Sequence, residues 1–187
     1  MKIISLKTID STSLELKRLI DKGDNLDSTS ILIIADSQYN GYGTHNRIWE
    51  SPEGNIYFSF NIKYDKYEHL PYFISFALFE TIKSYIDKTH KIHIKWPNDI
   101  MVDNLKIAGI LIEYYSEEYL IGIGVNLLTS PILSSTCIKN VIGMNTLPSR
   151  AQFIETFIKN FEKNKKLMKQ KGFLEFKRQW KKASRNF

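Results

Sequence analysis

Residues 91–128 form a succession of short strand-like runs joined by tight turns, a pattern that leaves few folds open to the chain. The runs cover 93–96, 100–102, 107–112 and 119–127. Asp103-Asn104 and Ser116-Glu117-Glu118 separate the later runs, and residues of these types favour turns. Because strands joined by such short turns pair antiparallel, this region predicts a β-meander.

The rest of the chain alternates between strand and helix patterns. Strands are predicted at 1–9, 31–35 and 56–62, and helices at 14–22, 71–88, 151–168 and 173–180. Residues 10–13 suit a helix N-cap, and the polar run 24–30 ends the first helix. Residues 36–54 and 130–149 lack periodicity and are predicted as loops. The fold class is therefore α+β, with a mixed, mostly antiparallel sheet flanked by helices.

The positive charge of the chain is concentrated at one end. The formal charge is +6, but residues 159–187 carry eleven basic and two acidic side chains, so the first 158 residues carry −3. Such a segment can bind nucleic acid. Its aromatic residues recur at helical spacing, however, which favours a buried position for Phe161, Phe173, Phe176 and Trp180.

Composition excludes several classes of protein. Apolar residues make up 43% and aromatic residues 13%, enough for a buried core. No apolar run reaches the roughly 20 residues of a membrane span, and the first residues do not resemble a signal peptide. Cys137 is the single cysteine, which fits the cytoplasm and makes a structural zinc site improbable.

Two glycines and two larger side chains stand out in the loop 36–54. Gly41 and Gly43 let backbone N–H groups approach an anion closely. Arg47 adds a cation with a geometry suited to carboxylate or phosphate, and Trp49 offers a flat face for a fused ring. An ordinary surface loop with a half-buried tryptophan is the alternative interpretation, because no helix follows as in nucleotide-binding glycine loops.

The strands carry further candidates. Lys95 ends a strand just before Trp96-Pro97-Asn98-Asp99 and can hold an anionic group, although a solvated lysine is the simpler reading of that position alone. Ala108-Gly109 interrupts a strand of bulky residues, and Gly122-Ile123-Gly124-Val125-Asn126 repeats small residues in another. Glycine within a strand often marks the close approach of a ligand or of another backbone segment.

Taken in order, these motifs resemble the catalytic domain of biotin protein ligases over residues 8–128. The resemblance rests on Lys95-Trp96-Pro97-Asn98-Asp99, on the loop Arg47-x-Trp49-x-Ser51-Pro52-x-Gly54, and on the other matching segments. These are Asp10-Ser11-Thr12, Gln38, Gly41/Gly43, Lys106-x-Ala108-Gly109-Ile110-Leu111-x-Glu113 and Gly122-x-Gly124-Val125-Asn126. It implies a class II synthetase-like fold, the biotin–lipoate ligase catalytic domain.

The resemblance also implies a two-step reaction. Biotin reacts with ATP to give biotinyl-5′-AMP, and a lysine of a biotin carboxyl carrier protein or domain then takes the biotinyl group. ATP and Mg²⁺ are the implied cofactors, and the Mg²⁺ ligands are unknown. The implied partner is a biotin-dependent carboxylase; DNA and membranes are not expected partners. Family members often form homodimers, so a homodimer is a candidate assembly.

The resemblance assigns roles residue by residue. Lys95 and Arg47 are the implied catalytic residues, facing the carboxylate and phosphates. The biotin-binding residues are Ser11, Thr12, Ser13, Gln38, Gly41, Tyr42, Gly43, Thr44, Lys95 and Gly109. The residues implied at ATP or the adenylate are Arg47, Trp49, Asn98, Lys106 and Asn126.

The loop departs from the family pattern. Tyr42 and Thr44 stand where many members carry arginine, Asn46 replaces a glycine, and Ser13 replaces the usual Asn. Each lost charged hydrogen bond costs on the order of 1.5–3 kcal/mol, so we expect weaker retention of biotinyl-AMP. Residues 39–50 are expected to be mobile without ligand and to close over the intermediate.

Several alternatives remain at this stage. A lipoate or octanoate ligase or transferase shares the fold, and an inactive relative is compatible with the altered loop. Nucleic-acid binding through the basic segment is a more distant alternative. The whole chain, 1–187, is expected to be one catalytic domain, without the N-terminal DNA-binding domain and the C-terminal small β-barrel of some members. The basic segment is expected to be a solvated helical face that attracts an acidic carrier.

Overall fold

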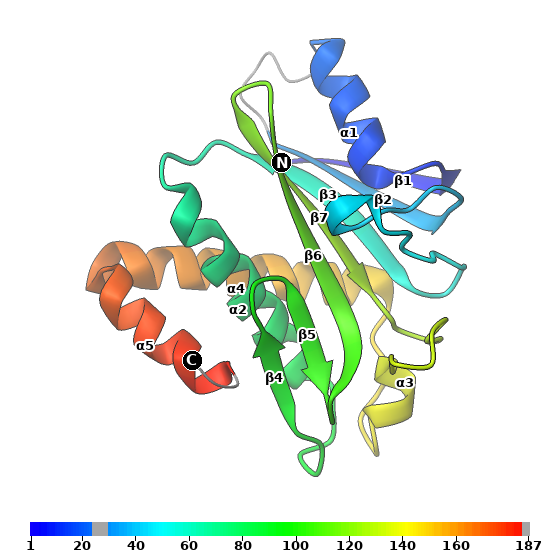
Figure 1. The fold of residues 1–187 in the computed structure, drawn as a ribbon, viewed down its shortest axis with the longest axis vertical. Coiled ribbons are helices and arrows are strands. Elements are labelled where there is room, and N and C mark those ends of the chain that lie inside the picture. Colours follow the sequence, from blue (N-terminus) through cyan, green and yellow to red (C-terminus); the bar gives the residue numbers. More distant parts are fainter. Residues whose placement is uncertain (24–29, 185–187) are drawn as a thin grey trace. The chain divides into compact units, whose positions relative to one another are not determined.

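The computed structural model describes residues 1–23 and 30–184 (Figure 1). These residues form two compact units. The first unit comprises Met1–Asp65 and Gly109–Leu127, and the second comprises Lys66–Ala108 and Leu128–Phe187. Apart from Ser30, the polar run predicted to end the first helix lies outside the described residues.

The first unit is built on a mixed sheet. Its strands are β1 (Lys2–Ile9), β2 (Ile31–Gln38), β3 (Ile56–Ile62), β7 (Glu118–Val125) and the part of β6 (Leu105–Tyr115) that starts at Gly109. Their order is β1-β2-β3-β7-β6. β1 and β2 pair parallel, whereas β2 with β3 and β3 with β7 pair antiparallel. Ser116 and Glu117 both have positive φ, as a two-residue hairpin between β6 and β7 requires.

One helix covers this sheet. α1 (Thr12–Asp21) starts at Ser11, whose side chain accepts a hydrogen bond from the Ser13 N–H and so caps the helix. Leu16 is fully buried and packs with Ile31, Ile33 and Leu120. Burying these apolar side chains fixes the first turn of α1 against the sheet of the first unit, which positions the residues of that turn.

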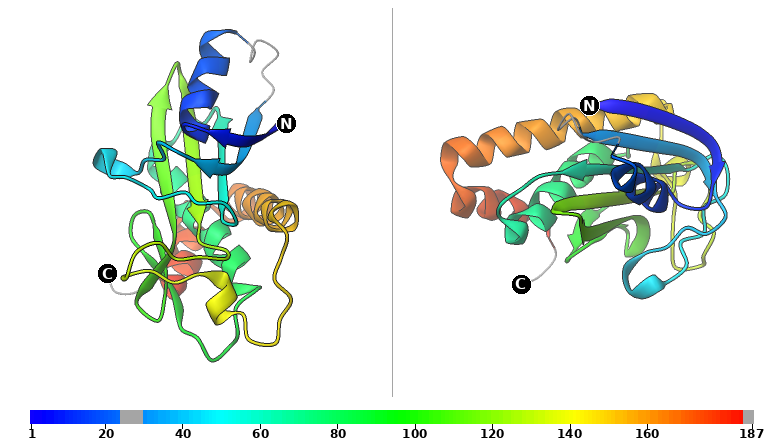
Figure 2. Two further views of the ribbon diagram at one scale, coloured as in Figure 1. Left: turned by 90° about the vertical axis from the view of Figure 1, so that its right-hand side faces the viewer. Right: turned by 90° about the horizontal axis from the view of Figure 1, so that it is seen from above.

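The second unit combines a hairpin with helices. Its elements are η2 (Tyr67–His69), α2 (Leu70–Lys83), β4 (Ile92–Lys95), β5 (Asp99–Val102), the first residues of β6, α3 (Ile138–Val141), α4 (Arg150–Lys171) and α5 (Phe173–Ala183). β4 and β5 pair antiparallel, and β5 is followed by β6 in the strand order. Figure 2 shows α4 and α5 as adjoining helices, and α2 packs against both.

The predicted elements are confirmed with three corrections. The helix predicted over 71–88 ends at Lys83, because the Ser84 hydroxyl donates to the Thr81 carbonyl and closes its last turn. Residues 130–149 are not wholly a loop: α3 forms there, with Ile138 and Val141 buried. β2 runs on to Gln38 through three residues predicted as loop, pairing along β1.

Three of the four C-terminal aromatic rings predicted to be buried are buried, and Phe173 is half-buried. Phe161, Phe176 and Trp180 are buried, and Phe173 stacks on the ring of His69 at a centroid distance of 3.8 Å. The rings are therefore part of the core rather than an exposed surface for nucleobases.

Candidate functional site

Three buried hydroxyls meet in the first unit. The cap at Ser11 turns Thr12 and Ser13 toward the middle of β3. There the Ser59 hydroxyl lies 2.7 Å from Thr12 Oγ1 and 3.0 Å from Ser13 Oγ. All three side chains are at most 5% exposed. We call Thr12, Ser13 and Ser59 the hydroxyl cluster. Ser59 was not among the predicted site residues, although a serine in the middle of a largely apolar strand was an available signal.

Gln38, at the end of β2, joins this cluster to the loop. Its Oε1 accepts hydrogen bonds from the N–H and the hydroxyl of Thr12, at 2.8 and 3.1 Å. Its Nε2 donates to Ser51 Oγ at 2.9 Å, and Ser51 in turn donates to the Trp49 carbonyl. The amide therefore has a defined orientation, and the Ser51 hydroxyl is a second contributor that the sequence analysis did not assign.

Two glycines of β7 leave room for these side chains. A Cβ atom at Gly122 would lie 2.8 Å from Ser13 Oγ, and one at Gly124 would lie 2.4 Å from the indole nitrogen of Trp49. Both distances are shorter than atoms tolerate. The close approach predicted from the small residues is thus made here by the protein's own Ser13 and Trp49.

The loop after β2 folds into a small hairpin. Trp49 N–H donates to the Gly41 carbonyl at 2.9 Å and Gly43 N–H donates to the Arg47 carbonyl at 2.8 Å. η1 (Thr44–Asn46) forms the tip. A hollow of about 410 Å³ lies over the hairpin, and Gln38, Gly41, Trp49 and Ser51 are among its lining residues. The Gly43 N–H, expected to approach an anion, is used within the loop in this structure.

Tyr42 is tied to a charged pair. Its hydroxyl donates to Glu113 Oε2 at 2.9 Å, and Lys17 Nζ lies 2.8 Å from Glu113 Oε1 and 3.3 Å from the Tyr42 oxygen. Burial, together with the negative charge of Glu113, raises the pKa of Tyr42. The hydroxyl therefore stays protonated at neutral pH and can donate. We call Lys17, Tyr42 and Glu113 the Tyr42 network.

The remaining site residues of the first unit are more exposed or lie deeper in strands. Arg47 is exposed, and its guanidinium donates to the Thr44 carbonyl and hydroxyl at 3.2 and 2.8 Å. Gly109 is half-buried in β6, and Asn126 is buried just after β7. The first unit thus holds twelve of the predicted site residues, and their roles stay predictions. They are Ser11, Thr12, Ser13, Gln38, Gly41, Tyr42, Gly43, Thr44, Arg47, Trp49, Gly109 and Asn126.

The second unit holds the other candidates. Lys95 is exposed at the end of β4 and is paired in register with Asp99, the first residue of β5. The connecting turn contains the cis Trp96–Pro97 bond and the half-buried Asn98. Lys106 Nζ lies 2.7 Å from Asp99 Oδ1. Lys95, Asn98 and Lys106 are therefore grouped around one hairpin, and their roles stay predictions.

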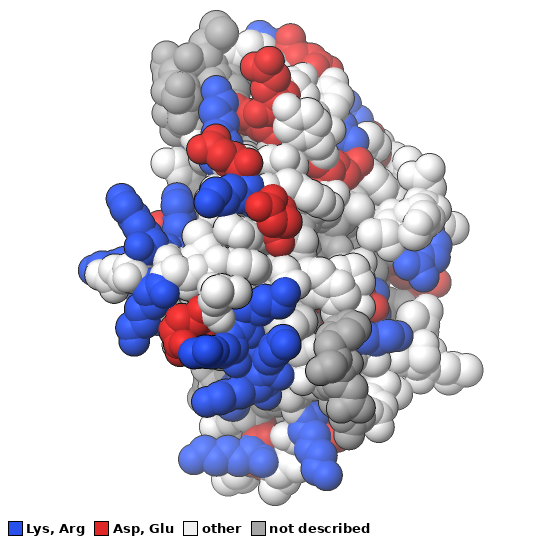
Figure 3. Space-filling view, turned by 60° about the vertical axis from the view of Figure 1, so that its left-hand side comes forward, with Lys and Arg blue, Asp and Glu red and all other residues white. Residues whose placement is uncertain are grey.

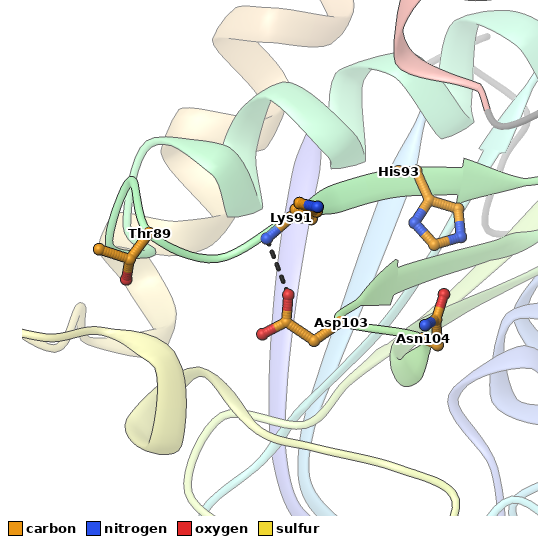
Figure 4. Close-up of a pocket in the computed structure, with 5 residues that line it drawn as sticks. All are labelled: Thr89, Lys91, His93, Asp103 and Asn104. Carbon is orange, nitrogen blue, oxygen red and sulfur yellow. Dashed lines mark hydrogen bonds between the residues drawn. The ribbon is translucent and has the colours of Figure 1, made fainter.

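A second hollow, of about 270 Å³, lies at the opposite end of that hairpin (Figure 4). Its lining residues are Thr89, Lys91, His93, Asp103 and Asn104. The Asp103 carboxylate accepts a hydrogen bond from Lys91 N–H at 2.9 Å and lies 2.6 Å from His90 Nδ1. The hydrogen bond with His90 lowers the pKa of Asp103. No predicted site residue lines this hollow.

Two negative findings apply to residues 1–23 and 30–184. No three His, Cys, Asp or Glu side chains there are grouped as a metal site would need. None of the helices in that part of the chain has both the length and the apolar character to cross a bilayer. Cys137 is buried, and its thiol donates to the Leu128 carbonyl.

The mixed sheet, the capped helix α1 and the hydroxyl cluster form one polar site on an α+β domain, and comparison with known proteins gives its family. The model of the Biotin/lipoate A/B protein ligase family matches residues 6–128. The chain belongs to this family.

The similar proteins are biotin ligases. Biotin–protein ligase 2 of Arabidopsis thaliana is 33% identical over 153 residues. The match covers 75% of this chain and 46% of the length of that protein. The biotin–[acetyl-CoA-carboxylase] ligase of Paracoccus denitrificans is 30% identical over 113 residues, covering 56% and 47%. This chain thus spans about half the length of the curated relatives it matches.

A solved structure extends the likeness to the fold. The biotin protein ligase of Aquifex aeolicus in complex with biotin and ATP superposes with a TM-score of 0.82 at 27% identity, over 98% of this chain and 78% of that one. The predicted fold class is confirmed by this match.

Proposed function

We propose that this protein is an ATP-dependent ligase that forms biotinyl-5′-AMP and transfers biotin to a lysine of a biotin carboxyl carrier domain. The observation that carries the proposal is the buried hydroxyl cluster beside Gln38. It offers both hydrogen-bond donors and acceptors in a dry environment, which suits the N–H and C=O groups of a ureido ring.

The same observation favours biotin over lipoate or octanoate. An acyl chain or a dithiolane ring has no polar group to pair with Thr12, Ser13 and Ser59. A site whose hydroxyls can hydrogen-bond the substrate favours it over an analogue that lacks the partner, because only the substrate can add hydrogen bonds to the cluster. The named relatives, which are biotin ligases, support the same choice.

The proposed chemistry has two steps. A biotin carboxylate oxygen bonds to the α-phosphorus of ATP as the bond to the pyrophosphate oxygen breaks. The amine of the carrier lysine then attacks the acyl carbon of the mixed anhydride, AMP leaves, and the nitrogen loses a proton to give the amide. Both steps need stabilised negative charge at the α-phosphate and exclusion of water.

Lys95 and Arg47 supply positive charge in this proposal. The ammonium of Lys95, exposed at the end of β4, would neutralise charge that develops between the carboxylate and the α-phosphate. Arg47, whose guanidinium donates to the main-chain and hydroxyl oxygens of Thr44 in this structure, would turn to the phosphates. Trp49 would cover the adenylate.

Mg²⁺ enters the proposal with ATP, since Mg²⁺ in such enzymes is held mainly by substrate phosphates and one or two carboxylates. The described residues contain no preformed group of three ligands. We therefore assign no residue to the metal and derive no step through it.

The proposal is tested with the purified chain, ATP, Mg²⁺, labelled biotin and an apo carrier domain. We expect label on the carrier, and loss of most of the transfer in Lys95→Ala. Parallel reactions with lipoate and octanoate test the other family activities. A well-folded protein that transfers none of the three would be the inactive relative.

The hydroxyl cluster itself is tested by Thr12→Val, which keeps the shape and removes the hydroxyl. We expect the Kd for biotin to rise roughly tenfold or more, since a buried polar group left without its partner costs about 1–3 kcal/mol. Isothermal titration calorimetry measures this Kd. Thr8→Val is the matched control, because Thr8 is an exposed residue of β1 outside the cluster. The Kd of this variant for biotin should equal that of the unaltered protein. Equal Kd values in both variants would contradict the assignment.

A further inference from the structure

α5 is held firmly against the hairpin that carries Lys95. The Trp180 indole donates to Ser75 Oγ at 3.0 Å and meets the ring of Trp96 edge to face at a centroid distance of 5.2 Å. A bridge joins Ile94 of β4 to Ser184 just after α5. Whatever binds to α5 is therefore held next to this hairpin of the second unit.

A hollow of about 270 Å³ opens where α5 meets the hairpin. Its lining residues are Tyr72, Trp96, Lys177, Trp180 and Lys181. Lys177 Nζ lies 5.1 Å from the centre of the Tyr72 ring. The hollow thus has aromatic walls and two ammonium groups. This chemistry suits an acidic side chain, whose methylene groups pack on the rings while its carboxylate meets the lysines.

Further basic residues lie along α4 and α5. Lys159, Lys163 and Arg178 are each paired with a glutamate. Within the ranges that the structure covers, no carboxylate pairs with the others, namely Lys165, Lys166, Lys169, Lys171, Lys181 and Lys182. Figure 3 shows basic side chains gathered on this side with few acidic ones among them. We call the hollow, together with the lysines that pair with no carboxylate of the described residues (Lys165, Lys166, Lys169, Lys171, Lys181 and Lys182), the α5 face.

We propose that the α5 face is the docking surface for an acidic patch on the carrier domain, with one carboxylate of the carrier seated between Lys177 and Lys181. The inference rests on the proposed ligase function. Charge complementarity identifies the partner as acidic, and the contacts of Trp180 and Ser184 place the docked surface beside the hairpin with Lys95. Opposite charges at an interface chiefly speed association and fix orientation.

Two observations favour an acidic protein over nucleic acid. Phe161 and Phe176 are buried and do not line the hollow, so their ring faces are not offered to stack on bases. The hollow is also smaller than the roughly 300–1,000 Å³ typical of ligand pockets, so it fits a single side chain better than a stacked base.

The test compares two double variants that remove the same charge, one from α5 and one from α4. Lys177→Gln/Lys181→Gln removes the two ammonium groups of the hollow. Lys159→Gln/Lys163→Gln is the control, because both lysines already pair with Glu155 and Glu80. Thermal unfolding verifies that both variants are folded. Biotinyl-AMP formation and biotin transfer to the apo carrier are then measured separately at several salt concentrations.

For the hollow variant we expect the carrier KM to rise roughly three- to thirtyfold and its salt dependence to flatten. The rate of biotinyl-AMP formation should be unchanged in both variants. A carrier whose acidic patch is converted to amides should show a high KM with every protein. Equal carrier KM values for the two variants would overturn the proposal.

Direct binding separates this inference from the proposed function. If the unaltered protein makes no biotinyl-AMP, the ligase proposal fails, and calorimetric binding of the apo carrier to the three proteins still decides the docking surface. Weaker binding by the hollow variant alone supports it. If the hollow variant binds the carrier as well as the unaltered protein does but loses binding to duplex DNA at 150 mM salt, the docking proposal is overturned in favour of nucleic acid.

Discussion

Gly124 and Trp49 show what a single residue means once its partner is known. The sequence marks Gly122 and Gly124 as small residues in a strand, which predicts close approach of something. Only the structure shows that the indole of Trp49 occupies the space above Gly124 and that Ser13 occupies the space above Gly122. The partners come from a loop and a helix far away in the chain, and local sequence carries no information about that meeting.

The contacts of Tyr42, which stands where many family members carry arginine, are also known only from the structure. Its hydroxyl is bonded to Glu113, which also holds Lys17, so this loop is fastened to β6 and α1 without bound ligand. The expected mobility of residues 39–50 stays a prediction, but the Tyr42 network gives it a defined fastening to test.

Removing the Tyr42 hydroxyl should loosen the loop. In Tyr42→Phe we expect faster hydrogen exchange at the amides of Gly43 and Trp49, which donate within the hairpin. A hydrogen bond to a charged group contributes about 1.5–3 kcal/mol, and the partial exposure of Glu113 puts the effect at the low end, roughly a tenfold change. Hydrogen-exchange mass spectrometry or NMR measures it.

Tyr39→Phe is the control for this experiment, because Tyr39 lies in the same loop with its ring 77% exposed. Its hydroxyl should not affect exchange at Gly43 and Trp49. If the two variants exchange alike, the Tyr42 hydroxyl does not fasten the loop.

At the level of helices and strands, the spacing of apolar residues predicted elements that bury one face. The strands of residues 91–128 and the helix α4 follow their apolar patterns because burial of one face drives both. α3 was missed because four residues are too few to display a helical period. The hairpin after β2 was missed because its pairing depends on Gln38 and Ser51, which lie on opposite sides of an irregular loop.

The start of α4 offers a test at this level. The Ser149 side chain accepts a hydrogen bond from Gln152 N–H, and the Gln152 side chain accepts one from Ser149 N–H, a complete capping box. We expect Ser149→Ala to lower the free energy of unfolding by about 1 kcal/mol, since the Gln152 N–H loses its side-chain acceptor. Urea unfolding followed by circular dichroism measures this loss. Ser149→Asp restores an acceptor and should recover most of it; a loss in Ser149→Asp as large as in Ser149→Ala would argue against capping.

For the protein as a whole, His69 links folding of the second unit to pH. The imidazole is buried and stacks on Phe173, which begins α5. Burial lowers the pKa of His69. The unfolded chain, with a histidine pKa of about 6.5, therefore binds a proton more readily than the folded one. This contribution to stability is complete above about pH 6.5 and is lost as the pH falls from there toward the folded-state pKa.

We therefore expect the urea concentration at the midpoint of unfolding to decrease when the pH is lowered from 7.5 to 5.5. The decrease should be smaller in His69→Phe, which keeps an aromatic ring against Phe173. His45→Gln is the control, because His45 is exposed in the loop of the first unit. A fall of the same size in His69→Phe would show that other groups cause it. Asp103, whose pKa is lowered, loses its contribution only in the more acidic range near and below about pH 4.

By itself, the sequence determined the order and type of nearly all elements, the aromatic core of the basic segment and the family of the chain. It could do so because hydrophobic period, turn residues and short motifs are local properties. Tertiary structure alone decided that Ser59 completes the hydroxyl cluster, that Glu113 holds Tyr42, and that Trp96 and α5 enclose a hollow with Lys177 and Lys181. These are contacts between segments distant in the chain. Their free energy comes from shape and charge that exist only when those segments are packed together.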